Sequence, residues 1–297
     1  MLQVLASIPS PSSGEFDLPG PLPAVHAYGL TLLVAIIAAI WLTKLRWGRR
    51  PGDLDLILRV AVWGVAAGIV GARAYHVVTS WDDVPDPKWK GVFMVWEGGL
   101  GIWGGILFGA LAGAIVVWRS KGSVLAALDA VAPGLLLAQA IGRLGNWWNQ
   151  ELYGKPTDLP WGLEIDDAHN MDYAPGTTFH PTFLYEMIWN LAGVVVLIVV
   201  ARRWTIKTPA LFSLYVAWYT FGRFFEEQLR VDPSTIFWGM RLNAWVSLVL
   251  FIVSSLFFIY WQLYRGAGGL PIEFPFGRRR EQARKKPPRM AIPRARR

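Results

Sequence analysis

The densest polar stretch of this sequence stands at the end of an apolar run, at Gly142–Gly154. It reads GRLGNWWNQELYG and holds one arginine, two asparagines, one glutamine and one glutamate within 13 residues. A capped helix end with one arginine reaching toward water would need little more than that arginine and a single Asn. The remaining polar side chains make Gly142–Gly154 a candidate functional site.

Two further polar clusters open or close apolar runs. In His180–Glu186 (HPTFLYE), the carboxylate of Glu186 begins an otherwise apolar segment. In Phe221–Arg230 (FGRFFEEQLR), Arg223 and Glu227 are four residues apart and share one helix face, so they are able to pair with each other. A surface ion pair with no further role is the alternative interpretation of this third cluster.

The three clusters together supply arginines and carboxylates at the same predicted end of the molecule. The guanidinium of arginine is a planar fork that binds phosphate bidentately, and carboxylate, Tyr or His side chains can accept a proton from a nucleophile. The sequence has no Cys and neither a G-x-S-x-G nor an H-E-x-x-H pattern, so it indicates no protein nucleophile and no zinc site. This chemistry favours an anionic lipid headgroup as ligand and transfer directly to an external acceptor, without a cofactor.

The composition of the chain is that of a membrane protein. Of its 297 residues, 54% are apolar and 17% charged, against roughly 25% charged in ordinary globular chains. The net charge is +8, but Arg278–Arg297 contains ten Lys or Arg and one Glu, so the remainder of the chain is close to −1. The basic character belongs to a tail, which argues against a nucleic-acid-binding protein.

Seven apolar segments predict an all-α integral membrane protein with seven transmembrane helices. Three carry no charge and are long enough to cross about 30 Å of hydrocarbon: Ala24–Thr43, Gly98–Trp118 and Leu242–Tyr264. Four more are interrupted or bounded by charge, and reach membrane length if one or two charges face the bundle interior: Val60–Ala72, Ala130–Gly142, Met187–Ala201 and Thr208–Gly222.

Lys and Arg in the loops predict the orientation. Basic residues follow the first, third, fifth and seventh spans, whereas the opposite loops are acidic or mixed. The positive-inside rule then places the N-terminus outside and the C-terminus in the cytoplasm. We expect a membrane domain at residues 1–265, with an extracytoplasmic segment at about residues 147–179 between spans four and five, and a basic, disordered cytoplasmic tail at residues 266–297.

The third predicted span is rich in glycine, including Gly98, Gly99, Gly104 and Gly105. Overlapping small-xxx-small spacings are typical of helices that pack closely in membranes. A second interpretation is a helix broken around Glu97–Gly105 that lines a cavity, which glycine makes possible. The two interpretations are compatible.

The polar motifs resemble those of the prolipoprotein diacylglyceryl transferases. GRLGNWWNQELYG is similar to the family pattern G-R-x-G-N-[F/W]-x-N-x-E-x-[Y/W]-G. Further similar motifs occur in the family order over most of residues 7–265: Ile8–Pro11, Tyr28–Leu30, Trp96–Gly99 with Gly104–Gly105, His180–Glu186, and Gly222–Phe224 with Glu227 and Arg230.

The resemblance implies a seven-span enzyme of the bacterial cytoplasmic membrane that performs the first step of lipoprotein maturation. Its substrates would be phosphatidylglycerol and the lipobox cysteine thiol of a prolipoprotein signal peptide, with glycerol phosphate released and no cofactor or metal. By motif match, Arg143 and Arg223 would hold the phosphate, and the implied catalytic set also contains Tyr28, Glu151 and Glu227. The implied substrate-binding set adds Asn146, Gly154, Tyr185, Glu186, Arg230, Gly98, Gly99 and Gly104.

One position departs from the family pattern. Many members have F-H-G-G where this sequence has Ile102-Trp103-Gly104-Gly105, and that histidine is assigned a role in activating the thiol. The indole of Trp103 cannot accept a proton. Either the histidine is dispensable, or another group replaces it, with His26, His180, Glu151 and Glu227 as candidates.

Two other functions are alternatives to the transferase. A non-enzymatic membrane carrier of an anionic lipid or solute would need a charged path to the cytoplasmic side, and no internal repeat of the kind carriers use is visible. A phospholipid alcohol transferase would need an aspartate series for metal binding, D-x-x-D-G…D-x-x-x-D, that this sequence lacks.

Overall fold

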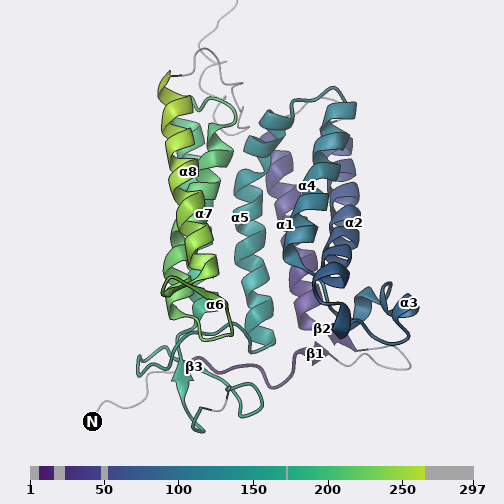
Figure 1. Ribbon diagram of the computed structural model, residues 1–297. Coiled ribbons are helices and arrows are strands. Elements are labelled where there is room, and N and C mark those ends of the chain that lie inside the picture. Colours follow the sequence, from purple (N-terminus) through teal and green to yellow (C-terminus); the bar gives the residue numbers. More distant parts are fainter. Residues whose placement is uncertain (1–6, 17–23, 48–52, 172, 265–297) are drawn as a thin grey trace, which may run out of the picture.

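The computed structural model describes residues 7–16, 24–47, 53–171 and 173–264. Within these ranges the chain is mostly helical (Figure 1). The long helices are α1 (Ala27–Trp47), α2 (Asp53–Thr79), α4 (Ile102–Arg119), α5 (Val124–Trp148), α6 (Thr182–Arg203), α7 (Ala210–Leu229) and α8 (Leu242–Tyr264). The predicted tail at residues 266–297 lies outside the described residues.

Short elements connect the helices at one end of the bundle. Two 3₁₀ turns, Trp81–Asp83 and Val95–Glu97, flank the short helix α3 (Lys88–Gly91) between α2 and α4. Three antiparallel two-stranded pairs complete the described part of the chain: β1 (Glu15–Phe16) with β2 (Val25–His26), β3 (Leu163–Glu164) with β4 (Thr178–Phe179), and β5 (Ile236–Phe237) with β6 (Met240–Arg241).

Six of the described helices, all of the long ones except α7, are long and apolar enough to cross a membrane. The predicted class, an all-α membrane protein, is confirmed at that level. The helix α7 differs because its last two turns contain Arg223, Glu226 and Glu227. Five of the six apolar helices also run past the predicted apolar segments at one or both ends, and Arg143 and Glu186 lie inside α5 and α6.

The third span begins later than predicted. Gly98 and Gly99 have φ angles of +85° and +67°, a left-handed conformation that glycine adopts without strain, so α4 starts at Ile102 and not at Gly98. Arg73 of α2 holds this turn, since its Nη1 donates to the carbonyl oxygens of Gly98 (2.8 Å) and Gly99 (3.0 Å).

The glycines of α4 pack directly against α2, as the small-residue spacing predicted. A Cβ on Gly104 would lie 2.1 Å from the carbonyl oxygen of Gly71, whereas a Cβ on Gly105 would lie 3.5 Å from its nearest neighbours. The two helix backbones therefore touch at Gly104, and the glycine there is required by the close approach.

The helices form two groups that meet at α5 (Figure 1). The first group is α1, α2 and α4, in which α2 packs on α4; the second is α6, α7 and α8, in which α7 packs on α8. Helix α5 packs on α1 in the first group and on α6 and α7 in the second. It therefore contributes side chains to the boundary between the groups.

Helix α5 binds the start of α7 through Asp129. The Oδ1 atom of Asp129 accepts a hydrogen bond from the backbone N–H of Phe212 (2.8 Å), one of the first-turn N–H groups that have no partner within a helix. Pro133 cannot donate to the carbonyl oxygen of Asp129, and Nη2 of the buried Arg46 donates to that oxygen instead (3.2 Å). The interior proline is thus accommodated by an arginine from α1.

The close contact of α2 and α4 gives a stability prediction. Gly104→Ala should lower the free energy of unfolding by about 1–3 kcal/mol, because the added methyl overlaps the Gly71 carbonyl. Gly105→Ala on the next position, where only ordinary contacts occur, should leave stability unchanged or slightly raised. Thermal unfolding of the two purified variants in the same detergent measures the difference, and equal unfolding temperatures would contradict the close backbone contact.

Candidate functional site

Arginine and carboxylate side chains meet between the end of α5, the start of α6 and the end of α7. Because these consecutive helices run antiparallel, the end of α5, the start of α6 and the end of α7 lie at the same end of the bundle (Figure 1). Arg143 in the last two turns of α5 forms an ion pair with Oε2 of Glu186 in the second turn of α6. The Glu186 side chain is 4% exposed, so the pair is shielded from water.

Arg223 of α7 joins the same carboxylate. Its Nη1 atom lies 3.2 Å from Oε2 of Glu186 and 3.0 Å from Oε2 of Glu226, and its Nη2 pairs with Oε1 of Glu227. A single carboxylate oxygen of Glu186 therefore contacts both Arg143 and Arg223. The two predicted phosphate-binding arginines are brought together around one anionic oxygen.

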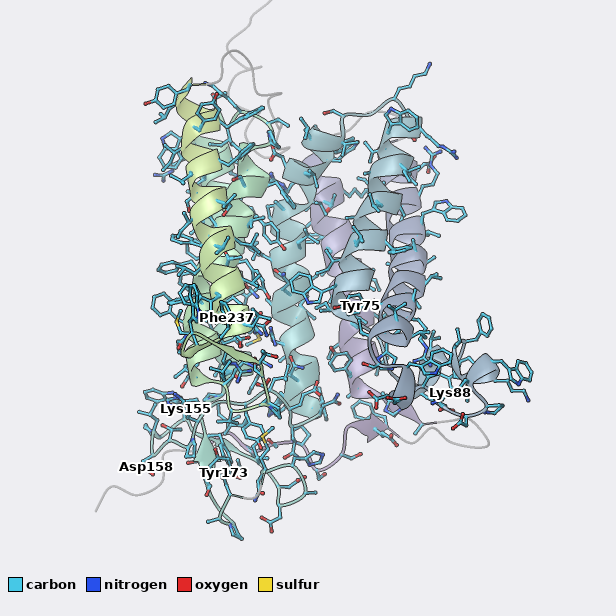
Figure 2. The ribbon with its side chains drawn as sticks, in the orientation of Figure 1. Tyr75, Lys88, Lys155, Asp158, Tyr173 and Phe237 are labelled. Carbon is cyan, nitrogen blue, oxygen red and sulfur yellow. The ribbon has the colours of Figure 1, made fainter. Side chains whose placement is uncertain are left out.

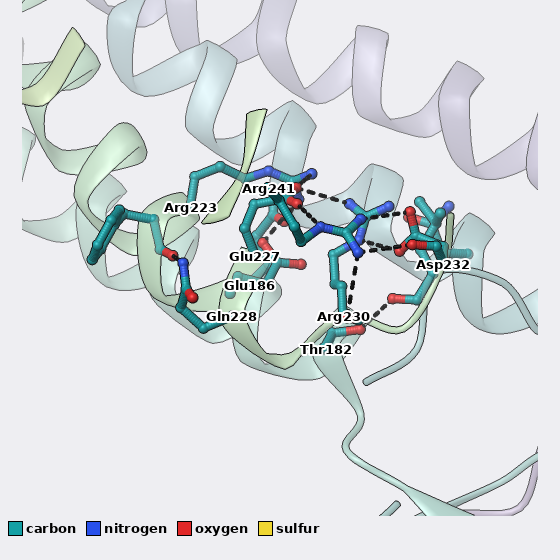
Figure 3. A network of polar contacts seen from close by, with 12 residues as sticks. Thr182, Glu186, Arg223, Glu227, Gln228, Arg230, Asp232 and Arg241 are labelled. Atoms are coloured by element: carbon teal, nitrogen blue, oxygen red, sulfur yellow. Dashed lines mark hydrogen bonds and ion pairs between the residues drawn. The ribbon is translucent and has the colours of Figure 1, made fainter. Parts of the chain in front are cut away.

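Glu227 is the most deeply buried charge of this cluster, with no exposed side-chain surface. Besides Arg223, it pairs with Nη1 of Arg230 (3.5 Å) and with Nε of Arg241 (2.7 Å), as Figure 3 shows. Three guanidinium groups thus surround one carboxylate. The predicted i,i+4 pairing of Arg223 with Glu227 is confirmed, but it is buried and shared with other partners rather than a separate surface pair.

The hairpin of β5 and β6 brings Arg241 into the cluster. Its Nη2 lies 2.9 Å from Oδ2 of Asp232, and Nε of Arg230 lies 2.6 Å from Oδ1 of the same aspartate. Burial opposes ionisation of Asp232, but the hydrogen bond from Arg230 and the charges of Arg230 and Arg241 outweigh it and hold the pKa of Asp232 below its usual range. Asp232 is therefore an anion that fixes the two arginines side by side.

The cluster has balanced formal charge. It contains four arginines and four carboxyl groups, which are Arg143, Arg223, Arg230, Arg241, Glu186, Glu226, Glu227 and Asp232. Charged groups that leave water need partners of opposite charge to offset the desolvation cost. The pairing explains how so many ionisable groups can occupy one region of an apolar bundle.

A hydrogen-bonded path leads from Arg143 to the surface. Arg143 Nη1 donates to Oδ1 of Asn146 (3.1 Å), and Nδ2 of Asn146 donates to Oε1 of Glu151 (2.7 Å). Glu151 borders a polar cleft of about 410 Å³, which is lined by residues 11–15, His26, residues 148–151, Asp166 and His169. The motif residues Arg143, Asn146 and Glu151 form one connected arrangement between this cleft and the buried cluster.

Tyr28 lies beside this path, at the start of α1. Its ring packs against Gly145, where a Cβ would approach within 2.6 Å of the ring. The hydroxyl is near enough to Glu151 and Arg143 to interact with their charges. Gly145 of the signature motif is thus explained by the close packing of the Tyr28 ring.

Gly154 lies in the segment that follows α5 and forms an antiparallel bridge with Arg230, whereas Tyr185 lies in the first turn of α6. The backbone N–H of Gly154 donates to the carbonyl oxygen of His180 (2.9 Å), and a Cβ on Gly154 would meet the His180 side chain at 2.7 Å. The Tyr185 hydroxyl accepts from Nε1 of Trp161 (3.0 Å) and lies 3.1 Å from Nδ1 of His180. Both residues position the loop against the start of α6.

This loop has a small apolar core of its own, formed by Tyr153, Leu163, Ile165, Phe179 and Phe183. The Tyr153 hydroxyl donates to the carbonyl oxygen of His169 (2.5 Å), and burial raises the pKa of Tyr153 to about 12. Figure 2 labels Lys155, Asp158 and Tyr173 of the loop at this end of the bundle. The predicted segment at 147–179 is thus a folded loop, although its first two residues belong to α5.

The glycines of the third span lie elsewhere. Gly99 faces Arg73 and His76, and Gly104 faces Gly71 and Tyr75. Among the contacts of the described residues, none joins Gly98, Gly99 or Gly104 to Arg143 or Arg223. Their substrate-binding role stays a prediction, while their packing role is visible.

The candidates for activating a thiol are distributed around the site. His26 pairs with Glu15 at 3.3 Å and is largely exposed, whereas His180 contacts Tyr185. Glu151 borders the cleft, and Glu227 is enclosed by arginines. Trp103 is 52% exposed on α4.

Sequence reasoning missed three members of the cluster: Glu226, Asp232 and Arg241. Glu226 stands three residues after Arg223, a spacing that pairs on a helix as well as the four-residue spacing of Glu227. Arg241 directly precedes the last apolar span, a position usually assigned to topology rather than to a site. Its place beside Glu227 depends on the β5–β6 hairpin, which turns the chain back toward α7.

The chain matches the family model for prolipoprotein diacylglyceryl transferase over residues 16–260. It is 46% identical over 271 residues to the phosphatidylglycerol–prolipoprotein diacylglyceryl transferase of Bifidobacterium adolescentis, covering 86% of this chain and 80% of the relative. It is 48% identical over 269 residues to the protein of that name from Cutibacterium acnes, covering 88% and 89% of the two chains.

Burial of Glu227 gives a stability prediction. Glu227→Gln should lower the free energy of unfolding by about 3–5 kcal/mol, because it leaves buried guanidinium groups without their shared anion. Glu97→Gln, which makes the same change at an exposed position, should have no effect. Chemical or thermal unfolding in detergent provides the measurement, and equal stability of the two variants would show that Glu227 is not an essential partner of the arginines.

Proposed function

This chain belongs to the prolipoprotein diacylglyceryl transferase family, and on that premise we propose that it transfers the diacylglyceryl group of phosphatidylglycerol to the lipobox cysteine thiol of prolipoproteins. Glycerol phosphate is the other product. The observation that carries the proposal is the single Glu186 oxygen held by both Arg143 and Arg223. The gap between the two guanidinium groups accommodates an anionic oxygen, and a phosphate oxygen has the same charge and hydrogen-bonding capacity.

The residues of the site have different parts in this reaction. Arg143 and Arg223 bind the phosphate and stabilise the charge that develops on the leaving oxygen. Glu227 and Asp232 hold Arg223, Arg230 and Arg241 in place and do not need to touch the lipid. Asn146 and Glu151 orient Arg143 from the side of the cleft.

The transfer itself requires one bond to form and one to break. The sulfur of the external thiol attacks the carbon of the diacylglyceryl unit that is bonded to the phosphate oxygen, and this carbon–oxygen bond breaks with its electron pair on the phosphate oxygen. The thiol proton leaves the sulfur and balances the new charge on the phosphate. No protein nucleophile or cofactor takes part in this scheme.

The proposal includes a topology with seven spans, in which α7 is the sixth. Helix α7 packs on both α6 and α8, and its charges are at one end only. The last turns of α1, α4 and α6 lie at the end of the bundle away from the cluster and contain Lys44, Arg119, Arg202 and Arg203. The positive-inside rule assigns this end to the cytoplasm. The ion-pair cluster and the cleft then face outward from the bacterial cytoplasmic membrane, where prolipoprotein thiols are presented.

A non-enzymatic carrier is not favoured. The substrate path of a carrier would need polar groups along the whole bundle. The arginines and carboxylates of the ion-pair cluster instead lie at one end of α5, α6 and α7. At the other end, the buried Asp129 binds the start of α7, and the buried Arg46 donates to the carbonyl oxygen of Asp129. The names of the relatives also specify a transferase.

Removal of a phosphate-binding arginine tests the proposal. With phosphatidylglycerol and a lipobox peptide as substrates, Arg143→Ala should reduce thioether formation by about a hundredfold or more, equivalent to roughly 3 kcal/mol. Arg143→Lys should recover little of the activity, because lysine lacks the planar fork. Mass spectrometry of the peptide measures the product.

The matched control is Arg119→Ala, which removes an exposed arginine in the last turn of α4, at the end of the bundle away from the cluster. This variant should leave the rate unchanged. Full activity of Arg143→Ala would remove that arginine from the mechanism. If the unmodified chain gave no thioether under conditions in which a known family member is active, the transferase function would be wrong for this chain.

The departure at Trp103 gives a second kinetic prediction. Trp103→Ala should keep more activity than Arg143→Ala or Arg223→Ala, because the exposed indole cannot accept a proton and forms no ion pair in the cluster. Initial rates of the three variants, normalised to folded protein, decide the order. The reverse order would show that Trp103 has a direct part in the reaction.

A further inference from the structure

Two carboxyl groups of the cluster are incompletely paired. Glu186 and Glu226 are 5% and 7% exposed, and in each of them Oε1 is buried with no hydrogen-bond partner in the described part of the chain. Their Oε2 atoms share Nη1 of Arg223, at 3.2 Å and 3.0 Å. Buried polar atoms almost always have a partner, so these two oxygens need an explanation.

A single proton would satisfy both. The carboxyl groups of Glu186 and Glu226 are neighbours, since their Oε2 atoms lie within 3.2 Å of the same Nη1 atom of Arg223. Two carboxylates only accept hydrogen bonds, whereas one carboxylic acid donates to a neighbouring carboxylate. Two like charges at such a separation also do not readily ionise together in a buried site.

The surroundings of the pair contain charges of both signs. Arg143 of α5 and Arg223 of α7 face it, and the Tyr219 hydroxyl of α7 lies near Glu186 and both arginines. Helix α8, which packs on α7, contains no Asp, Glu, Lys, Arg or His. With two arginines beside two carboxyl groups, loss of one proton changes the net charge at the phosphate-binding position directly.

The charge balance of the whole cluster shows what that proton does. With all four carboxyl groups ionised, the four arginines are neutralised and an anionic headgroup meets no net positive charge. With one proton on the Glu186–Glu226 pair, the cluster has a charge of +1. A phosphodiester has a charge of −1, so this state is the complementary one.

We propose that Glu186 and Glu226 share one proton in the working enzyme, and that this proton gives the cluster the positive charge with which it binds the phosphodiester headgroup. The inference rests on the proposed function, in which Arg143 and Arg223 hold the phosphate. Glu226 is a positioning residue here: it sets the charge and orientation of Arg223 and Glu186 without touching the reacting carbon.

The pH dependence follows from the sign of the charge. Raising the pH removes the shared proton, and the cluster becomes neutral. Above the pH at which the pair loses this proton, headgroup affinity should fall by about tenfold per pH unit, as expected for one linked proton. Glu226→Gln is neutral at every pH and its amide still donates to Glu186. In this variant the affinity should stay at the low-pH level of the unmodified chain throughout.

The experiment measures binding of short-chain phosphatidylglycerol to the full chain in detergent over a pH series, with phosphatidylcholine as the background lipid. The same series is measured as thioether formation, where the effect should fall on KM rather than on kcat. Glu97→Gln removes an exposed carboxylate and should keep the pH dependence of the unmodified chain. Gln228→Ala, at an exposed position of α7, controls for substitution in that helix.

A calorimetric measurement needs no variant. Heats of phosphatidylglycerol binding in two buffers with different ionisation enthalpies give the number of protons taken up, which should approach one per lipid above the titration of the pair. Glu226→Gln, where it folds, should take up none. Binding that is independent of pH and takes up no proton in the unmodified chain overturns the proposal, as does an unchanged pH dependence in Glu226→Gln.

Failure of the proposed function gives a different result. If Arg143→Ala and Arg223→Ala bind phosphatidylglycerol as tightly as the unmodified chain, the phosphate lies elsewhere and both proposals fall. If both arginines are required but the affinity does not depend on Glu226, only the shared proton is wrong. The binding series therefore separates the two proposals.

Discussion

The cost of placing charge in an apolar bundle is the constraint on which the rest of this structure depends. Glu227 has no exposed side-chain surface and would not be tolerated as an isolated anion. It is accepted because Arg223, Arg230 and Arg241 reach it from three directions. The helix ends, the β5–β6 hairpin and the loop after α5 are all arranged so that each buried ion meets a partner.

Pairing of this kind gives the site its rigidity as well as its charge. Arg223 pairs with three carboxyl groups, and Arg143 contacts Glu186 and Asn146. Neither guanidinium can therefore rotate without breaking these contacts. In the proposed reaction, a phosphate would meet donors already in position, which would reduce the reorganisation that binding requires. The partners of the arginines are thus as important for recognition as the arginines themselves.

The sequence was sufficient for the apolar elements and for the arginines that anchor the site. Apolar runs predicted each long helix, although charges inside α5, α6 and α7 made the predicted segments too short. Arg143 and Arg223 stood out because a charge beside an apolar run is costly and conspicuous. The start of α4 was not predictable from hydropathy, since Gly98 and Gly99 are apolar by composition and break the helix by conformation.

Sequence reasoning missed three members of the cluster for two physical reasons. Arg241 and Asp232 reach the cluster through the path of the chain between α7 and α8, which depends on a two-residue strand pairing with almost no sequence signal. Glu226 and Glu227 are adjacent, and the helical period alone does not say which of them faces Arg223; in the structure both do. The contacts that depend on a loop, and the pairing of one arginine with two adjacent carboxylates, therefore could not be predicted from the sequence.

The hydrogen bond from Phe212 to Asp129 has a consequence for the distant site. Helix α5 holds α7 at two points: at its start through Asp129, and near its end through the Glu186 oxygen that Arg143 shares with Arg223. Asp129 and Arg143 are 14 residues apart, about 21 Å along a helix. Two attachments this far apart fix how far α7 slides and turns against α5. The contact at one end of the bundle therefore limits where Arg223 can lie along the bundle axis at the other end.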